Sequence, residues 1–171
     1  STLFPYTTLF RSVPFAFAPT TVLAQVDASI GGKNGINGEQ YKNMLGIIRQ
    51  PQFILFDYGF FQTLPEEEWI SGFAEIIKCA CILDSGLFDF LEKNKEAALQ
   101  RETKTVAMLV EKSVIHKSEI VKEDEFENNK RRWLNFGHTI GHAVEKLENI
   151  AHGKAVSIGM VAASRLSEKI T

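Results

Sequence analysis

The chain of 171 residues has few cysteines, no long apolar run and no excess of charge of one sign. Its two cysteines, Cys79 and Cys81, form a C-x-C spacing that is neither a disulfide framework nor a usual zinc knuckle, so we expect two core thiols in a reducing cytoplasm. No apolar run suggests a membrane span. A net charge of -2 provides no broad basic surface for nucleic acid. Composition therefore argues against both kinds of partner.

Hydrophobic residues make up 44% of the chain, enough for one substantial core, and the chain is too short for two large domains. Internal repeats and low-complexity segments are also missing. Residues 1–12, STLFPYTTLFRS, have no regular period and no signal-peptide pattern, and they resemble translated adapter sequence. We set them aside as a non-native leader.

Two regions with different patterns follow the leader. Residues 19–30 have helical apolar spacing with a proline near the start and two glycines just beyond the end, and QFILFD (residues 52–57) is typical of a buried strand. The segment NGINGEQYKNMLG between them is predicted to be a loop. The composition becomes helical near residue 64, which predicts an α/β part at 13–64 and an all-α part at 65–171.

Several helices are expected in the second part. In TLPEEEW, Thr63 and Glu66 have the spacing of a capping box, and Pro65 suits a first helical turn. The charged stretch KEDEFENNKRR should be a solvated connection. Apolar spacing predicts further helices at residues 86–98, 103–121, 138–149 and 155–169.

Glu75 and Lys78 are the only charges in an otherwise apolar helical segment, GFAEIIKCACIL. A helix that is apolar on every face is usually buried, so these charges need partners. One interpretation is an ion pair between residues i and i+3 within the core. The other is that Glu75 binds a metal ion while Lys78 contacts an anionic substrate.

Three of the four histidines fall within fifteen residues: His138, His142 and His152. The first two lie one helical turn apart, and the third is beside a glycine in a predicted turn. Two histidines and a buried Glu75 make the ligand set of a catalytic zinc with one open position. Each histidine alone is more often a structural residue, so spacing does not decide between these interpretations.

Polar residues in the α/β part form a third group, namely Asp27, Lys33, Lys42 and Asn43. Glycines near them allow a ligand to approach the backbone closely, and lysines provide charges for phosphate or carboxylate. The segment GGKNG alone would be interpreted as an ordinary surface turn.

Five segments in order, PTTVLAQVDASIGGKNGIN, YKNMLG, TLPEEEWISGFAEIIK, RRWLNFGHTIGHAVE and HGKAVSIGM, resemble the motifs of the 3-dehydroquinate synthase family. The resemblance covers residues 13–171. It implies the end of a Rossmann-like NAD-binding domain followed by a helical metal- and substrate-binding domain. It also implies closure of a sugar acid phosphate into a ring in the shikimate pathway, with NAD and a divalent metal, zinc or cobalt.

The resemblance also implies residue roles. The metal ligands are Glu75, His138 and His152, and His142 faces the substrate as a proton-transfer and anion-binding residue. The residues expected to contact substrate are Lys33, Lys42, Asn43, Lys78, Lys117, Arg131, Asn135 and His142, of which Lys78, Lys117, Arg131, Asn135 and His142 are expected to be catalytic. The residues expected near NAD are Thr20, Thr21, Asp27, Lys33, Lys42 and Thr63.

The family's NAD pyrophosphate loop has no counterpart in this sequence, so we expect a central fragment of the enzyme. The complete enzyme is expected to be a homodimer in the cytoplasm. The isolated chain is expected to bind metal without turning over. Two alternatives remain: another sugar-phosphate cyclase, making an inosose or valiolone product, and an inactive helical fragment with structural histidines. The segments GGK and GIN favour a 3-dehydroquinate synthase over another sugar-phosphate cyclase.

Overall fold

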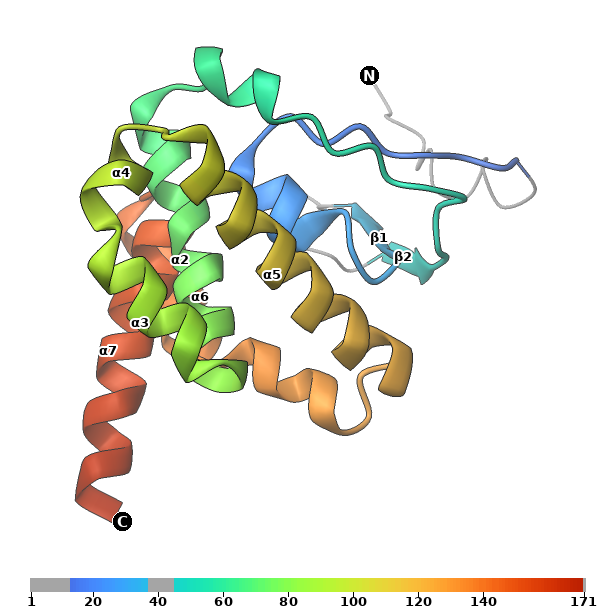
Figure 1. Ribbon diagram of the computed structural model, residues 1–171. Coiled ribbons are helices and arrows are strands. Elements are labelled where there is room, and N and C mark those ends of the chain that lie inside the picture. Colours follow the sequence, from blue (N-terminus) through green and yellow to red (C-terminus); the bar gives the residue numbers. More distant parts are fainter. Residues whose placement is uncertain (1–12, 37–44, 171) are drawn as a thin grey trace.

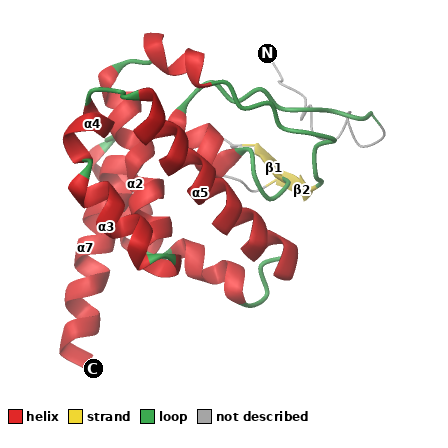
Figure 2. Ribbon diagram, in the orientation of Figure 1, coloured by secondary structure: helices red, strands yellow, loops and turns green. Residues whose placement is uncertain are grey.

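The computed structural model describes residues 13–36 and 45–170. Helices dominate these residues, and the sheet among them has two strands (Figure 2). In chain order the elements are η2 (Ala24–Ala28), β1 (Lys33–Ile36), β2 (Leu45–Ile48), η3 (Tyr58–Thr63), α2 (Glu66–Leu83), α3 (Ser85–Lys93), α4 (Lys95–Leu99), α5 (Thr103–Glu123), η4 (Lys130–Asn135), α6 (His138–Glu148) and α7 (His152–Ile170).

The hydrophobic core lies between η2, α2, α3 and α5. Trp69, Leu87 and Leu109 are 0% exposed and Val22 is 1% exposed within one cluster of buried residues. The sequence prediction of a helix over 103–121 is confirmed by α5, whose apolar residues face this core. The prediction over 138–149 is confirmed by α6.

Two predicted helices have different bounds in the structure. The helix expected at 86–98 is divided into α3 and α4 at Asn94, whose side-chain amide donates a hydrogen bond of 2.8 Å to the Phe90 carbonyl. Such a local bond competes with the helical backbone and ends the turn. The last helix begins at His152 rather than at residue 155, so His152 is helical and not in a turn.

The capping box predicted for α2 is wrong. Pro65 occupies the N-cap position and has no side chain that could accept a hydrogen bond, so α2 starts at Glu66. The Thr63 hydroxyl instead donates to the Phe60 carbonyl at 3.4 Å. Three acidic residues in the first turn favour this start by complementing the positive end of the helix dipole.

The buried strand predicted at 52–57 is also wrong. Phe53 is 61% exposed and Leu55 is 57% exposed. This segment runs beside residues 15–17, with one parallel bridge between Phe17 and Ile54 (Figure 1). A strand is buried only where other elements cover it, and among the described residues just this one extended neighbour pairs with it.

The structure places a sheet where the sequence predicted a loop. Strands β1 and β2 pair antiparallel, with Gly35 opposite Gly46. Glycine has low strand propensity and no side chain to reveal an alternating pattern, so these strands could not be predicted from residue pattern. The sheet lies at one end of η2 (Figure 1).

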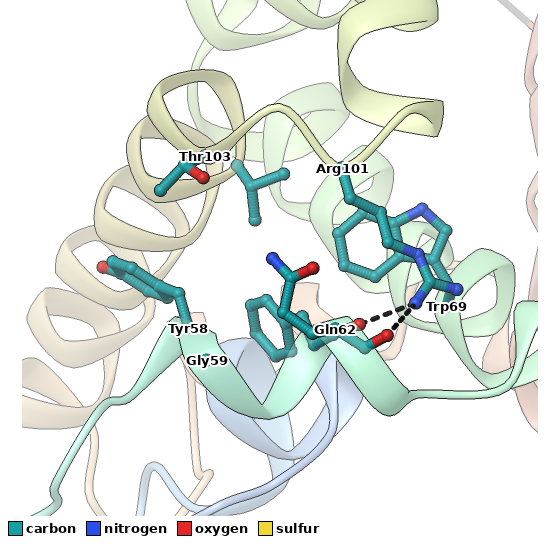
Figure 3. A pocket seen from close by; sticks show the side chains of 8 residues that line it. Tyr58, Gly59, Gln62, Trp69, Arg101 and Thr103 are labelled. Atoms are coloured by element: carbon teal, nitrogen blue, oxygen red, sulfur yellow. Dashed lines mark hydrogen bonds between the residues drawn. The ribbon is translucent and has the colours of Figure 1, made fainter.

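Arg101 joins the α/β part to the helices. Its guanidinium donates to the Phe61 carbonyl at 2.6 Å and to the Leu64 carbonyl at 2.8 Å, and it lies 5.0 Å from the centre of the Trp69 ring. Figure 3 shows Arg101 beside Trp69 and Gln62 at the wall of a cavity of about 250 Å³ that Tyr58 also lines. The bonds fix the path of η3 before α2 begins.

The two cysteines lie on opposite sides of α2. Cys79 is buried, as predicted, but Cys81 is exposed, so the prediction of two core thiols is wrong for Cys81. Residues two apart on a helix differ by about 200° in direction and cannot both face one core. Burial raises the pKa of Cys79 to about 12. None of the helices in the described ranges has the length and apolarity to cross a bilayer.

Candidate active site

Glu75 lies at the centre of the candidate site. Glu75 and Lys78 are each 3% exposed, and Oε2 of Glu75 forms an ion pair with the Lys78 ammonium. The other oxygen, Oε1, faces the rings of His138 and His152. Neither oxygen accepts a hydrogen bond from the described part of the chain. The carboxylate of Glu75 thus forms the ion pair with Lys78 and still has acceptor capacity that a cation would satisfy.

The two histidines direct the same ring nitrogen toward Glu75. Nε2 of His138 lies 3.6 Å from Glu75 Oε1, and Nε2 of His152 lies 3.7 Å from the same atom. The opposite nitrogens have partners of their own: Nδ1 of His138 is 3.3 Å from the Phe136 carbonyl oxygen, and Nδ1 of His152 is 3.2 Å from Glu145 Oε2. Two Nε2 atoms thus share the space beside Glu75.

This donor set fits a divalent metal ion. One ligand atom from each of Glu75, His138 and His152 lies within 4.8 Å of the others. A tetrahedral zinc with bonds of about 2.0 to 2.2 Å holds its ligand atoms about 3.3 to 3.6 Å apart. The separations of 3.6 and 3.7 Å need only a small inward shift. Two imidazoles and one carboxylate also leave a coordination position for substrate.

Glycines bring α6 and α7 close enough to build this set. A Cβ at Gly159 would lie 1.9 Å from the Gly137 carbonyl oxygen, and a Cβ at Gly153 would lie 2.0 Å from the Ser71 carbonyl oxygen. The first contact packs α7 against the start of α6, and the second packs it against α2. Side chains at either position would separate the helices that carry the three candidate ligands.

The two histidines have opposite pKa shifts. Burial, followed by the charge of Lys78, lowers the pKa of His138 below its ordinary value. The neighbouring Glu75 carboxylate raises the pKa of His152, and the hydrogen bond with Glu145 acts in the same direction. The lowered pKa favours neutral His138 at pH 7, which is the form that binds a metal ion.

His142 is placed differently from the other two histidines. It is exposed, and its ring centre lies 5.1 Å from that of His138 and 6.0 Å from that of His152. Its ligand atoms group with those of Glu145 and His152, and not with Glu75. His142 therefore lines the space in front of the three-ligand set.

A cavity of about 680 Å³ adjoins the set and brings together most of the predicted site residues. It lies between β1, β2 and the helices. Among the residues lining it are Asp27, Lys33, Lys78, Lys117, Arg131, Asn135, His138, His142 and His152.

Asp27 and Lys117 form an ion pair at the wall of this cavity. The Lys117 ammonium lies 2.5 Å from Asp27 Oδ1 and 2.6 Å from the Asp27 carbonyl oxygen. Burial alone raises the pKa of Asp27, but the charges of Lys117 and Lys78 outweigh it and hold that pKa well below the ordinary value. Burial lowers the pKa of Lys117, and Asp27 opposes this shift.

Glu127 connects two predicted site residues, and sequence reasoning missed it. It forms an ion pair with Lys33 and accepts a hydrogen bond of 2.8 Å from the Asn135 side chain. Glu127 lies in the charged stretch that was predicted to be a solvated connection, where one glutamate among several carries no distinguishing signal. Only the fold shows that it faces the cavity.

Arg131 shows that this stretch is partly buried, contrary to the prediction. Arg131 is 2% exposed and donates to the Gly31 carbonyl at 2.9 Å and the Glu125 carbonyl at 2.5 Å. Asp124, which is 9% exposed, accepts hydrogen bonds from backbone N–H groups at residues 128, 129 and 131. The folded turn provides partners for both charges, so they tolerate burial.

The other residues predicted for the NAD and substrate sites do not join this group. Thr20 and Thr63 are exposed and are not among the lining residues of the cavity. The Thr21 hydroxyl accepts a backbone hydrogen bond of 3.1 Å at the start of η2. Lys42 and Asn43 lie outside the described residues.

Two family models match the chain consecutively. The model for the N-terminal part of 3-dehydroquinate synthase matches residues 2–71, and the model for the C-terminal part matches residues 72–171. The chain belongs to the 3-dehydroquinate synthase family. The motif resemblance is thereby confirmed, and the predicted domain boundary near residue 64 stays a prediction.

Curated relatives agree with this family assignment. The chain is 48% identical over 161 residues to a 3-dehydroquinate synthase of Citrifermentans bemidjiense, covering 92% of this chain and 44% of the relative. It is 44% identical over 166 residues to that of Geotalea uraniireducens, covering 95% of this chain and 46% of the relative. The chain therefore spans a little under half the length of these relatives.

Solved structures of sugar-phosphate cyclases share the fold. ValA, the 2-epi-5-epi-valiolone synthase of Streptomyces hygroscopicus subsp. jinggangensis, with NAD+ and Zn2+ bound, has a TM-score of 0.83 at 32% identity over 91% of this chain and 45% of that one. A 2-deoxy-scyllo-inosose synthase complexed with carbaglucose-6-phosphate, NAD+ and Co2+ has a TM-score of 0.86 at 29% identity, covering 94% and 44%. The predicted fold class is confirmed.

Proposed function

We propose that the protein is a 3-dehydroquinate synthase, which converts 3-deoxy-D-arabino-heptulosonate 7-phosphate to 3-dehydroquinate and phosphate in the shikimate pathway. The observation that carries the proposal is the position of Glu75 Oε1 beside two histidine Nε2 atoms, at the wall of a cavity rich in cationic side chains. Relatives at 42–48% identity bearing that name support the choice of substrate.

Glu75, His138 and His152 would hold the metal ion, zinc or cobalt. The solved cyclases with Zn2+ or Co2+ and NAD+ support both cofactors. The ion would supply Lewis acidity, and NAD would accept and return a hydride. Asp27 and Lys33 are proposed to contact NAD. Thr20, Thr21 and Thr63, which are not among the residues lining the cavity, and Lys42, which lies outside the described residues, are proposed as further NAD contacts.

The chain's own residues would bind and orient the substrate. Lys117, Arg131 and Asn135 lie around one cavity, where ammonium, guanidinium and amide groups suit carboxylate, phosphate and hydroxyl groups. Lys33, Lys78, Lys42 and Asn43 are proposed to complete the set. Fixing a flexible anionic substrate in one geometry is itself a large contribution to rate.

His142 is proposed to transfer protons and to bind an anionic group of the substrate. It lines the cavity and is exposed, so its ring can exchange protons with both ligand and solvent. It also lies apart from Glu75, which leaves its nitrogens available for this role.

The decisive experiment is an assay of phosphate release by the complete enzyme, supplied with NAD+ and Zn2+. The sugar acid phosphate should be turned over, and a hexose 6-phosphate should not. Turnover of the hexose phosphate would favour the inosose alternative, which the likeness to 2-deoxy-scyllo-inosose synthase motivates. Absence of stoichiometric metal and of any turnover would support an inert helical fragment.

Three further expectations belong to this proposal. The isolated chain of 171 residues is predicted to bind metal but to show no turnover at ordinary NAD concentrations. The complete enzyme is predicted to be a homodimer and to work in the cytoplasm. Turnover by the isolated chain near that of a complete relative would contradict the first of these.

A further inference from the structure

Glu145 lies on the same side of α6 as His138. They are seven positions apart, which corresponds to about two turns of helix. The next helix, α7, begins at His152 and packs against α6, and the His152 ring lies beside Glu145. The side chain of Glu145 is 13% exposed. A carboxylate this sheltered from water needs a donor, and the His152 ring provides one.

The two nitrogens of His152 face two different carboxylates. Nδ1 lies 3.2 Å from Glu145 Oε2, while Nε2 lies 3.7 Å from Glu75 Oε1. If Nδ1 carries the proton and donates it to Glu145, the lone pair of Nε2 is directed at the space beside Glu75. That tautomer is the one that metal binding through Nε2 requires.

His138 has the same arrangement with a weaker acceptor. Its Nδ1 is 3.3 Å from the backbone carbonyl oxygen of Phe136, and its Nε2 faces Glu75. Both rings are therefore oriented through Nδ1, one by a neutral carbonyl and one by a carboxylate. A carboxylate on the far side of a ligating imidazole fixes the ring and increases its basicity.

We propose that Glu145 is a positioning residue for the metal site: it accepts the Nδ1 proton of His152 and so commits Nε2 to the metal. This inference rests on the proposed metal site and adds a residue to it. Glu145 belongs neither to the three-ligand set nor to the residues that line the cavity. Removing it should weaken metal binding by about 10- to 100-fold while leaving the fold intact.

The first experiment measures the tautomer without metal. Spectra of 15N-histidine-labelled, metal-free protein at alkaline pH should show His152 with its proton on Nδ1. In Glu145→Ala it should shift toward the Nε2–H form, and Glu145→Gln should keep it in part, because an amide oxygen still accepts. His152 as Nε2–H in the unaltered protein, or unchanged in Glu145→Ala, would overturn the proposal.

The second experiment measures zinc affinity by competition with a chromophoric chelator. Glu145→Ala should bind zinc about 10- to 100-fold more weakly, and Glu145→Gln should fall between it and the unaltered protein. Glu148→Ala is the matched control, since Glu148 is exposed on the same helix and should leave the affinity unchanged. Equal affinity of all variants would overturn the proposal.

Two further outcomes separate this inference from the proposed function. If the unaltered protein binds no zinc, the metal site fails, while the tautomer spectra still decide the role of Glu145. If it binds two ions and Glu145→Ala loses only the weaker one, then His142, Glu145 and His152 form a second ion site. That result would overturn the positioning role and leave the proposed function standing.

Discussion

At the scale of single residues, the cavity is built from cations that already have anionic partners. Lys117 pairs with Asp27, and Lys33 pairs with Glu127. Each pair offsets the cost of removing a charge from water. An anionic ligand must therefore compete with carboxylates of the protein, so pairing keeps the site folded and tunes its affinity at the same time.

The two histidines of α6 should respond differently to substitution. His138→Ala should lower zinc affinity by more than about 100-fold and abolish activity, because it removes a ligand. His142→Ala should keep zinc and lose rate, because its ring faces the cavity rather than Glu75. Metal content and kcat, measured on both variants of the complete enzyme, check this. Equal loss of zinc in the two would show that their roles are divided wrongly.

Asp27 should contribute stability that depends on pH. Its folded-state pKa is lower than its unfolded value of about 3.9, so the contribution is present above that pH and declines as the pH falls toward the folded-state pKa. Asp27→Asn should cost about 1 to 3 kcal/mol at pH 7, since it leaves the buried Lys117 ammonium without its carboxylate partner, although the backbone carbonyl of residue 27 still accepts from it.

Urea unfolding between pH 7 and pH 3 measures this effect. The difference between Asp27→Asn and the unaltered protein should shrink below about pH 4. Asp89→Asn, at an exposed position on α3, is the control and should follow the unaltered protein throughout. A difference in the free energy of unfolding that does not change with pH would contradict the lowered pKa of Asp27.

At the scale of elements, apolar spacing predicted the helices well and the extended segments poorly. α5 was predictable because its buried residues recur every three or four positions. β1 and β2 were not, because a paired Gly35 and Gly46 give no periodic signal. The buried strand predicted at residues 52–57 was wrong because an apolar run is buried only where other elements of the fold cover it.

The packing of α7 should tolerate no side chain at Gly153. Gly153→Ala should destabilise the protein by at least about 2 kcal/mol and weaken zinc binding, because its Cβ would lie 2.0 Å from a backbone oxygen of α2. Gly86→Ala is the control. Its Cβ would lie 3.1 Å from a single side-chain atom, so alanine there should change the stability by less than about 1 kcal/mol.

Thermal unfolding of both variants and zinc titration of the folded Gly153→Ala protein measure these effects. A Gly153→Ala protein as stable as Gly86→Ala would mean that α7 shifts without loss.

At the scale of the whole molecule, the site is assembled from segments far apart in sequence. The family's motifs allowed the sequence to predict Glu75, the histidines and most of the cationic residues. Glu127 and Glu145 were not predictable, because their importance depends on which side chains the fold places beside them. Residue type can suggest a ligand, whereas an orienting residue is recognised only by distance.

Metal binding should stabilise the whole protein. If the ion binds the folded state alone, zinc at 100 times its Kd should add about 2.7 kcal/mol to the free energy of unfolding. The midpoint of thermal unfolding should rise with zinc in the unaltered protein and stay constant in His138→Ala. An equal rise in both would indicate that the ion binds elsewhere.

The bonds from Arg101 to the Phe61 and Leu64 carbonyls have a consequence for proteolysis. Proteases bind their substrates as extended backbone, and a 3-10 turn whose carbonyls are already bound cannot adopt that shape. Tyr58, Phe60 and Phe61 would otherwise be good sites for chymotrypsin, and Phe60 is 40% exposed. In Arg101→Ala this segment should be cut faster than in Arg165→Ala, leaving the helices from α2 onward as one product. The Arg101 side chain is thus expected to protect the segment between the two parts of the molecule from cleavage.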